Sequence, residues 1–260
     1  MIVGPKTKFH SLYNHMFSQT CHKFSGVVDS FLASNGGALR KATQDHVRES
    51  LRVLHEALER YDLNQISLSY NGGKDCQVMV ILLLAALWRR FGEDPAVLNN
   101  LGAFKSVYVA SEKAFEEVDT FVDNSCQEYG LQQIRLSEPM KAAFEHFLSE
   151  NPTVKAIIVG IRRSDPYGQQ LKPFDPTDSG WPDFMRVHPV LEWKYVNIWD
   201  FLRGTDSAYC CLYDKGYTSL GGTDSTVPNP KLLKKGTCAE FLPAYALVKD
   251  EEERLGRFRK

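Results

Sequence analysis

The chain has 260 residues, of which 43% are apolar and 12% are aromatic, and its formal net charge is −1 at pH 7. This length and composition fit one large folded domain and exclude a disordered chain. The near-neutral charge argues against non-specific nucleic-acid binding as the main function, although it is compatible with a local basic pocket.

The spacing of the cysteines and the length of the apolar runs indicate the cellular compartment of the protein. None of the six cysteines forms a C-x-x-C pair, and Cys210 and Cys211 are adjacent, which disfavours a disulfide between them. No run approaches the roughly 20 apolar residues that a membrane span needs. We expect a reduced, cytoplasmic protein. A mitochondrial pool stays open, because the first 28 residues carry no Asp or Glu.

The first half of the chain alternates helical and strand patterns. Residues 41–61 carry apolar side chains at helical spacing, and residues 66–69 alternate as a strand does. The elements expected after these are a buried helix at 76–88, a strand at 105–110, a helix at 112–129, a strand at 131–136, a helix at 138–148 and a strand at 154–160.

This order predicts an α/β fold, namely a mostly parallel sheet with helices on both faces and right-handed crossovers. Ligands of such sheets bind beyond the carboxyl ends of the strands. Residues 71–75 and 162–165 each follow a strand. We therefore expect both segments at the same edge of the sheet.

The pattern changes after Gly160. Residues 164–183 are rich in proline and glycine and read as a long loop, which in a compact domain is more often functional than idle. A strand near 187–191 and a helix near 197–202 follow, and then irregular chain. We expect one domain over 1–260, with an N-terminal extension at 1–40, an α/β core at 41–203 and a C-terminal segment at 204–260 that completes the active site.

The stretch SYNGGKDC at 69–76 connects a strand to an apolar helix. Small residues there let backbone N–H groups converge on an anion at a helix N-terminus, although a plain tight turn is the alternative. The spacing matches neither the Walker A nor the dinucleotide glycine motif. It resembles the pyrophosphate loop of the adenine nucleotide α-hydrolase superfamily, usually S-G-G-x-D-S, whose members cleave ATP between the α and β phosphates.

Four further stretches narrow the resemblance. GIRRSDPY at 160–167, DPTDSGWPDFMR at 175–186, LYDKGYTSLG at 212–221 and the ending DEEERLGR at 250–257 occur in this order. Together with the loop they resemble the eukaryotic FAD synthetases (FMN adenylyltransferases), whose fold is like that of phosphoadenylylsulfate reductases. The resemblance implies the reaction FMN + ATP → FAD + pyrophosphate with Mg²⁺, small-molecule substrates, no nucleic acid or membrane partner, and apo-flavoproteins as recipients of FAD.

The resemblance also implies the site residues. Asn71, Asp75, Asp165, Arg254 and Arg257 are expected around the phosphates, with Asp75 holding Mg²⁺ directly or through water. Arg162 and Arg163 are candidates for the FMN phosphate, because arginine forks match phosphate geometry, and which of the two points inward stays open. The remaining expected contacts are Asp178, Trp181 and Arg186 for the flavin, and Ser69, Tyr70, Gly72, Gly73, Lys74, Tyr108 and Gly160 for ATP.

Plainer interpretations exist for several of these residues. Asp75 could cap the helix that follows it, and Trp181 could pin the loop to the core. The acids and arginines of the ending could form i,i+4 pairs, Asp250 with Arg254 and Glu253 with Arg257.

Three other functions are alternatives to FAD synthesis. A phosphoadenylylsulfate reductase requires a late nucleophilic cysteine, and Cys238 lacks the expected Glu-Cys-Gly setting. A tRNA-modifying enzyme would need paired cysteines or a basic domain, and neither is visible in the sequence. A flavin or nucleotide carrier without turnover would be separated from the enzyme by an activity assay.

Overall fold

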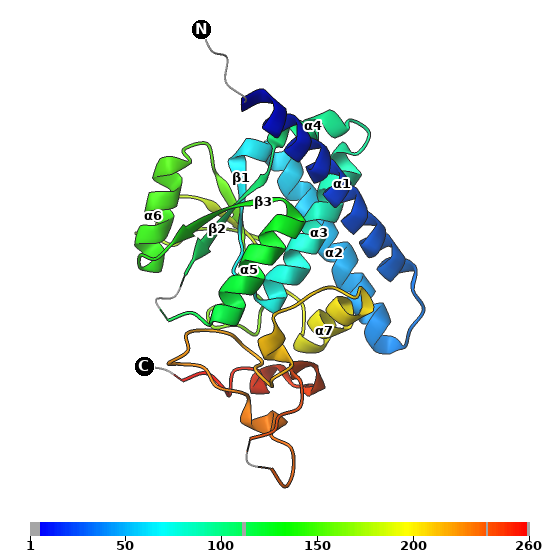
Figure 1. The fold of residues 1–260 in the computed structure, drawn as a ribbon, viewed down its shortest axis with the longest axis vertical. Helices are drawn as coiled ribbons and strands as arrows, with labels where there is room; N and C mark the ends of the chain where they lie inside the picture. Colours follow the sequence, from blue (N-terminus) through cyan, green and yellow to red (C-terminus); the bar gives the residue numbers. More distant parts are fainter. Residues whose placement is uncertain (1–5, 111–112, 238, 259–260) are drawn as a thin grey trace.

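A six-stranded sheet with the strand order β3-β2-β1-β4-β6-β5 organises the chain (Figure 1). The computed structural model describes residues 6–110, 113–237 and 239–258. Neighbouring strands pair in parallel except for β5 and β6, which pair antiparallel. The strands are β1 (Ile66–Ser69), β2 (Phe104–Val109), β3 (Leu131–Leu136), β4 (Ala156–Ile158), β5 (Phe174–Pro176) and β6 (Met185–Val187).

Helices cover both faces of this sheet, as predicted. Helix α6 packs on one face through Phe144 and Phe147, which share a cluster with Val107 and Ile157 of the strands. The opposite face carries α3, with α1, α2 and α7 packed against it. The helices are α1 (Lys6–Ala33), α2 (Ala38–Arg60), α3 (Lys74–Phe91), α4 (Pro95–Leu101), α5 (Glu116–Tyr129), α6 (Met140–Glu150) and α7 (Tyr195–Gly204).

Helix α3 is the centre of the larger core. Every side chain from Val78 to Leu87 is fully buried, because the helix is enclosed by the sheet on one side and by other helices on the rest of its surface. This burial explains an apolar run that has no polar stripe. In the part of the chain that the structure describes, no helix is both long enough and apolar enough to cross a membrane.

Two elements were not expected from the sequence. Helix α1 occupies most of the predicted N-terminal extension, and its Phe24, Val28 and Phe31 belong to the main core. Helix α4 was not predicted at all; its first residue, Pro95, follows Asp94, whose side chain accepts a hydrogen bond from Ala96.

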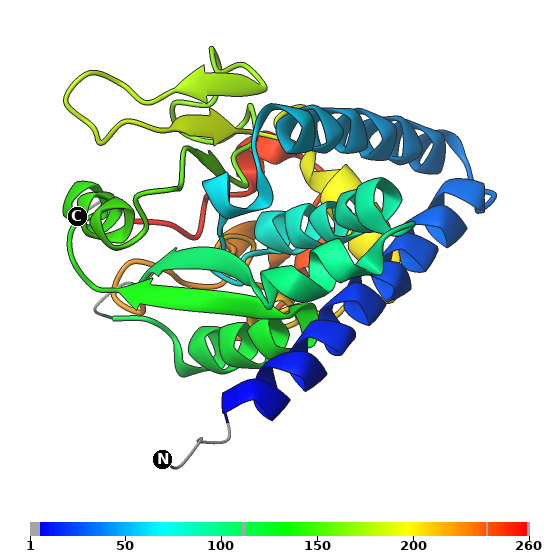
Figure 2. The ribbon, with the colours of Figure 1, turned by 90° about the horizontal axis from the view of Figure 1, so that it is seen from above.

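The prediction around residues 164–191 was partly wrong. A short strand, β5, lies inside the expected loop, and the expected strand at 187–191 is instead β6, which ends at Val187. Pro189 has no N–H to donate to a sheet ladder, so the strand cannot continue through it. Figure 2 shows this β5–β6 hairpin beside α2, where the Arg60 guanidinium lies 4.1 Å from the Phe174 ring centroid.

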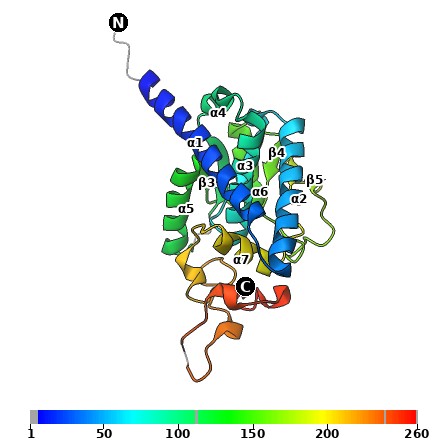
Figure 3. The ribbon, with the colours of Figure 1, turned by 90° about the vertical axis from the view of Figure 1, so that its right-hand side faces the viewer.

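The C-terminal segment lies beyond α7 and near the end of α5, as Figures 1 and 3 show from two directions. In its described residues, 205–237 and 239–258, it contains only short 3-10 turns and isolated bridges. It still contributes Leu212, Tyr213, Leu232, Ala244 and Leu247 to the main hydrophobic core. This anchoring brings the last turns of the chain back to the carboxyl ends of the strands.

Candidate active site

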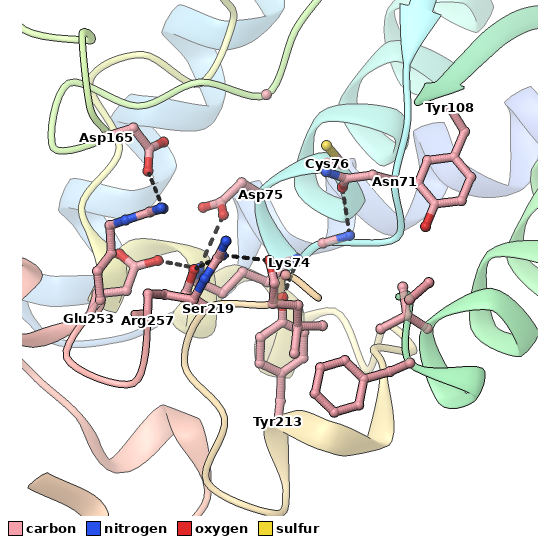
Figure 4. A pocket seen from close by; sticks show the side chains of 18 of the residues that line it. Asn71, Lys74, Asp75, Cys76, Tyr108, Asp165, Tyr213, Ser219, Glu253 and Arg257 are labelled. Atoms are coloured by element: carbon pink, nitrogen blue, oxygen red, sulfur yellow. Dashed lines mark hydrogen bonds and ion pairs between the residues drawn. The ribbon is translucent and has the colours of Figure 1, made fainter. Parts of the chain in front are cut away.

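A cavity of about 270 Å³ lies at the carboxyl ends of β1, β2 and β4 (Figure 4). Segments distant in sequence enclose it, among them the 71–76 loop, the two ends of the 160–165 segment and the C-terminal turns. The predicted ATP and catalytic residues that line it are Asn71, Gly73, Lys74, Asp75, Tyr108, Gly160, Asp165, Arg254 and Arg257.

The loop at the start of α3 has a defined backbone geometry. The Asn71 Oδ1 atom accepts a hydrogen bond from the Gly73 N–H at 2.9 Å, and the Tyr213 hydroxyl accepts one from the Lys74 N–H at 2.9 Å. Gly72 has φ of +71°, and a Cβ there would lie 2.6 Å from Val122, so only glycine fits. Gly73 is the N-cap residue and makes no side-chain cap, so Asp75 is not the helix cap.

Beneath this loop lies a buried ion cluster, formed by Lys74, Asp75, Arg162, Asp250 and Glu253. The Arg162 side chain is fully buried, and its Nε atom lies 2.6 Å from the Asp75 Oδ1 atom. Its Nη1 and Nη2 atoms pair with Asp250, at 3.2 Å, and with Glu253. The Lys74 ammonium pairs with Asp75, at 3.1 Å, and with Glu253. The cluster therefore joins α3, the segment after β4 and the C-terminal end.

The cluster fixes the charge state of its members. Burial alone would raise the pKa of the Asp75 carboxyl, but the Arg162 and Lys74 charges outweigh it and hold that pKa below its usual value. Burial alone would lower the pKa of the Lys74 ammonium, and the Asp75 and Glu253 carboxylates reverse this and raise it. Asp75 therefore stays ionised at the loop, and the Lys74 ammonium is taken up by carboxylates instead of facing open space.

A second carboxylate, Asp165, shares the cavity with Asp75. The Asp165 Oδ2 atom accepts the Arg162 N–H at 2.9 Å, and the Arg254 Nη1 atom is 3.9 Å from the Asp165 Oδ1 atom. Burial, followed by the Asp75 charge, raises the pKa of the Asp165 carboxyl. Asp75 and Asp165 carry like charges in one cavity and repel each other, and a bound cation would relieve this repulsion.

The donor set fits Mg²⁺ brought in by a polyphosphate. No group of three or more His, Cys, Asp or Glu side chains that could hold a metal ion occurs among the residues that the structure describes. Mg²⁺ in nucleotide sites commonly takes one or two carboxylates, with phosphate oxygens and water completing its shell. Asp165 and Asp75 match that need, since both carboxylates line the cavity.

Two arginines, Arg254 and Arg257, also line the cavity, and within the described residues Arg257 forms no ion pair with a carboxylate. The Arg257 Nη1 atom donates to the Ser219 Oγ atom at 3.2 Å and to the Leu220 carbonyl at 2.8 Å. Its buried Nε atom has no hydrogen-bond partner among the described residues. Burial, followed by the Arg254 charge, lowers the pKa of the Arg257 guanidinium. Two close guanidinium groups with spare donors form a ready site for phosphate oxygens.

The other end of the cavity is apolar. It is lined by Val109, Ala114, Phe115 and Val118 together with the ring of Tyr108. Burial, followed by the Asp119 charge, raises the pKa of Tyr108 to about 12, so its hydroxyl stays neutral. Figure 4 shows Tyr108 and Asp165 at opposite sides of the view. The cavity therefore combines a place for a flat ring with a place for phosphates.

Three predicted ATP residues shape the loop without lining the cavity. The buried Tyr70 hydroxyl donates to Gln77 Oε1 at 2.5 Å and lies 2.7 Å from Ser125 Oγ. The Ser69 carbonyl accepts from the Cys76 thiol at 3.7 Å, and Gly72 backs onto Val122. Their role in this structure is to support the turn between β1 and α3.

The flavin candidates lie apart from these residues. Arg163 points to the exterior, where its Nε atom donates to the Glu192 carboxylate at 2.9 and 3.0 Å and its Nη1 atom donates to the Gln169 carbonyl. Neither Arg162 nor Arg163 lines the cavity. Asp178, Trp181 and Arg186 belong to the β5–β6 hairpin.

On that hairpin the flavin candidates partly contact one another. The Arg186 Nη1 atom lies 3.4 Å from Asp178 Oδ2, and the Arg186 Nη2 atom donates to the Pro176 carbonyl at 2.8 Å. Trp181 is 40% exposed on this hairpin.

Several lining residues were not predicted. They are Cys76, Val109, Ala114, Phe115, Val118, Tyr213, Ser219, Leu220, Gly221 and Glu253. The stretch at 212–221 carried a signal for Tyr213 and for 219–221, because its resemblance to the family had already been noted. The sequence gives no signal for a role of Glu253 in the site beyond its position in the acidic C-terminal end. The predicted i,i+4 pair with Arg257 is not formed; Glu253 contacts Lys74 and Arg162 instead.

Comparison with known proteins shows which family the chain belongs to. Residues 65–153 and 143–228 match the model of the phosphoadenosine phosphosulfate reductase domain. The chain is 43% identical over 215 residues to a probable FAD synthase of Schizosaccharomyces pombe, covering 82% of this chain and 79% of that one. The chain belongs to the FAD synthase family. It is also 35% identical to a probable FAD synthase of Caenorhabditis briggsae over 95% of its own length, and it spans 47% of that longer protein.

Solved structures agree with membership of the FAD synthase family. The crystal structure of Candida glabrata FMN adenylyltransferase in complex with FAD and inorganic pyrophosphate superposes with a TM-score of 0.87 at 29% identity, covering 94% of this chain and 98% of that one. A phosphoadenylyl-sulfate reductase of Candida auris reaches a TM-score of 0.51 at 14% identity and shares the fold alone. The reductase alternative is therefore disfavoured, and Cys238, on which it depended, lies outside the described residues.

Proposed function

We propose that this protein is an FMN adenylyltransferase, which transfers AMP from ATP to the phosphate of FMN and releases pyrophosphate. The observation that carries the proposal is one cavity that combines an apolar end, a strand-to-helix loop and two arginines. Among the residues that the structure describes, Arg257 forms no ion pair with a carboxylate, and the Arg254 Nη1 atom lies 3.9 Å from Asp165 Oδ1. Related chains named FAD synthase, and a solved relative in complex with FMN and an ATP analogue, support it.

The reaction needs positioning and charge neutralisation more than proton transfer. An oxygen of the FMN phosphate attacks the α-phosphorus of ATP, a new P–O bond forms, and the bond to the β-phosphate oxygen breaks as pyrophosphate leaves. The nucleophile is already an anion, so no general base is required. Arg254 and Arg257 would neutralise the charge that develops on the departing pyrophosphate. The loop from Asn71 to Lys74 would hold the phosphates in line with the nucleophile.

Mg²⁺ is the proposed cofactor. Asp165 and the ionised Asp75 would hold it together with phosphate oxygens, and it would supply further neutralisation of the triphosphate. The raised pKa of the Asp165 carboxyl supports this assignment, since a bound cation would relieve its repulsion with Asp75. Arg162 serves this arrangement by fixing Asp75 from below, at 2.6 Å.

The adenine ring of ATP and the flavin ring of FMN are assigned to different parts of the protein. Tyr108 and the apolar side chains around it would take the adenine ring, with Gly160 leaving room beside the loop. Asp178, Trp181 and Arg186 of the hairpin would take the flavin. Arg163, through its bonds to the Gln169 and Leu171 carbonyls, would brace the segment that leads to that hairpin.

The organisation and surroundings of the enzyme follow from the same proposal. Residues 1–260 would form one domain, in which α1 of the 1–40 extension packs against α3, 41–203 is the core and 204–260 completes the site. A reducing compartment, the cytoplasm first and a mitochondrial pool second, is supported by the free state of Cys21, Cys76, Cys126, Cys210 and Cys211. Apo-flavoproteins would receive the FAD.

The test is a product analysis. The purified protein is mixed with ATP, Mg²⁺ and FMN, and the flavins are separated by chromatography while pyrophosphate is measured in parallel. We expect FAD and pyrophosphate in equal amounts over many turnovers. Intact FMN would refute the proposal, and release of sulfite from phosphoadenylylsulfate in a parallel assay would favour the reductase.

A further inference from the structure

We propose that the Ser219–Gly221 turn holds the Arg257 guanidinium in one orientation and that Gly221 is a positioning residue for this guanidinium. We call this turn the seat. The inference rests on the proposed function, because it assigns Arg257 to the phosphates of ATP. The resemblance to the family implies a role for Arg257 but none for the turn at 219–221. In the structure this turn orients the arginine, and the guanidinium fits against the turn because Gly221 has no side chain.

The guanidinium lies directly against the Gly221 backbone. A Cβ atom built at Gly221 would be 2.3 Å from Arg257 Nη2, 2.5 Å from Cζ and 3.0 Å from Nε. Among the described residues other than the two chain neighbours of Gly221, these are the three nearest atoms, and all belong to one flexible side chain. The Gly221 φ angle lies outside the left-handed region, so the backbone would accept an alanine. Glycine is therefore needed here for space and not for conformation.

The turn also fixes the direction of the side chain. The Ser219 Oγ atom and the Leu220 carbonyl both accept from Arg257 Nη1, at 3.2 and 2.8 Å. Both acceptors are neutral, in contrast with the three carboxylates that surround Arg162. The seat thus orients the Arg257 charge without cancelling it, and in the part of the chain that the structure describes the buried Nε donor has no hydrogen-bond partner. An arginine held in this way can give its charge to an anion.

The backbone that carries Arg257 is held independently of the seat. The Arg257 N–H donates to the Arg254 carbonyl at 2.9 Å, and Arg257 forms an antiparallel bridge with Thr226. The Val227 N–H donates to the Gly256 carbonyl at 2.9 Å. A group that intrudes at Gly221 would therefore displace the guanidinium and leave the chain in place.

A double-mutant cycle separates positioning from structure. Wild type, Gly221→Ala, Arg257→Ala and the double variant are compared for ATP affinity by titration calorimetry and for kcat of FAD formation. We expect Gly221→Ala to weaken ATP binding and lower kcat by about tenfold in the wild-type background, and by less than about twofold in the Arg257→Ala background, because the group it displaces is then gone. Gly26→Ala, where a Cβ would meet nothing within 4 Å, is the matched control and should change neither value.

The outcomes are distinct. Equal losses in both backgrounds, or no loss in either, would overturn the inference, and so would loss of folding on Gly221→Ala in both backgrounds, because the clash would then be with the framework. If the wild type binds ATP but forms no FAD, the proposed function fails, and the cycle of ATP affinities still decides the role of Gly221. If the wild type binds no ATP, both proposals fail.

Discussion

The side chains of Lys74 and Glu253, 179 residues apart in the chain, form a buried ion pair that ties the first turn of α3 to the C-terminal end. Lys74 is 2% exposed and Glu253 is 4% exposed, so water screens this pair very little. Glu253 also pairs with Arg162, which fixes Asp75. One charge cluster therefore holds the ionised carboxylate of the loop and ties the loop to Glu253, which precedes Arg254 in the C-terminal end.

Removing the Glu253 carboxylate should destabilise the protein strongly. Glu253→Ala would leave two buried cations short of a partner, and we expect a loss of about 3–5 kcal/mol in the free energy of unfolding, measured by urea denaturation. Glu251→Ala, an exposed acid two positions away, serves as the control and should change the stability by less than about 0.5 kcal/mol. Equal stabilities of the two variants would show that the cluster does not anchor the ending.

The charge of Asp75 should matter more than its size. Asp75→Asn keeps the shape but removes the negative charge that Arg162 and Lys74 hold, and we expect kcat for FAD formation to fall by about a hundredfold or more. Asp45→Asn on the outer face of α2, where the acid is 77% exposed, should leave kcat unchanged. An Asp75→Asn enzyme with near-normal kcat would remove Asp75 from the catalytic residues.

Replacing Asp165 should have opposite effects on stability and on activity. The raised folded-state pKa of its carboxyl means that the charged form is disfavoured in the folded protein, chiefly by burial and then by Asp75. Asp165→Asn should therefore raise Tm at pH 7 while FAD formation falls. The gain in Tm should shrink as the pH drops through the raised pKa, because the wild-type carboxyl is then neutral as well. A lower Tm at pH 7 would contradict this account of the cavity.

Tyr108 should act through its ring. Tyr108→Phe keeps an aromatic face and should leave the KM for ATP within about threefold, while Tyr108→Ala should raise it about tenfold with little change in the KM for FMN. Steady-state kinetics with each substrate varied in turn measures this difference. A rise in the KM for FMN alone would place the flavin, and not the adenine, at this end of the cavity.

The sheet was predictable because its first four strands are short segments with strand-like patterns, and helical patterns separate them. The parallel order then placed Asn71–Asp75 and Asp165 at one edge, and the cavity does contain both. The hairpin was not predictable: β5 contains Asp175 and Pro176, which disfavour a strand, and it forms because β6 offers an edge in register with it. Helix α1 lacked a clear polar and apolar pattern, although its buried residues are central to the core.

The directions in which individual side chains point could not be predicted from the sequence either. Arg162 and Arg163 are neighbours with the same chemistry, yet the first is buried among carboxylates and the second pairs with Glu192 at the surface. Only the packing of the C-terminal end against the core separates them. The same holds for Glu253, whose partners lie 179 and 91 residues away, too far along the chain for any local pattern to indicate them.

The central claim is AMP transfer, and isotopic labelling tests it most directly. The protein is incubated with FMN, Mg²⁺ and ATP labelled in either the α- or the γ-phosphate, and the flavins are isolated. We predict that the α-label enters FAD in equal amount to the FMN consumed and that the γ-label leaves entirely as pyrophosphate. Label from the γ-phosphate in a flavin, or no labelled flavin from either ATP, would contradict the account.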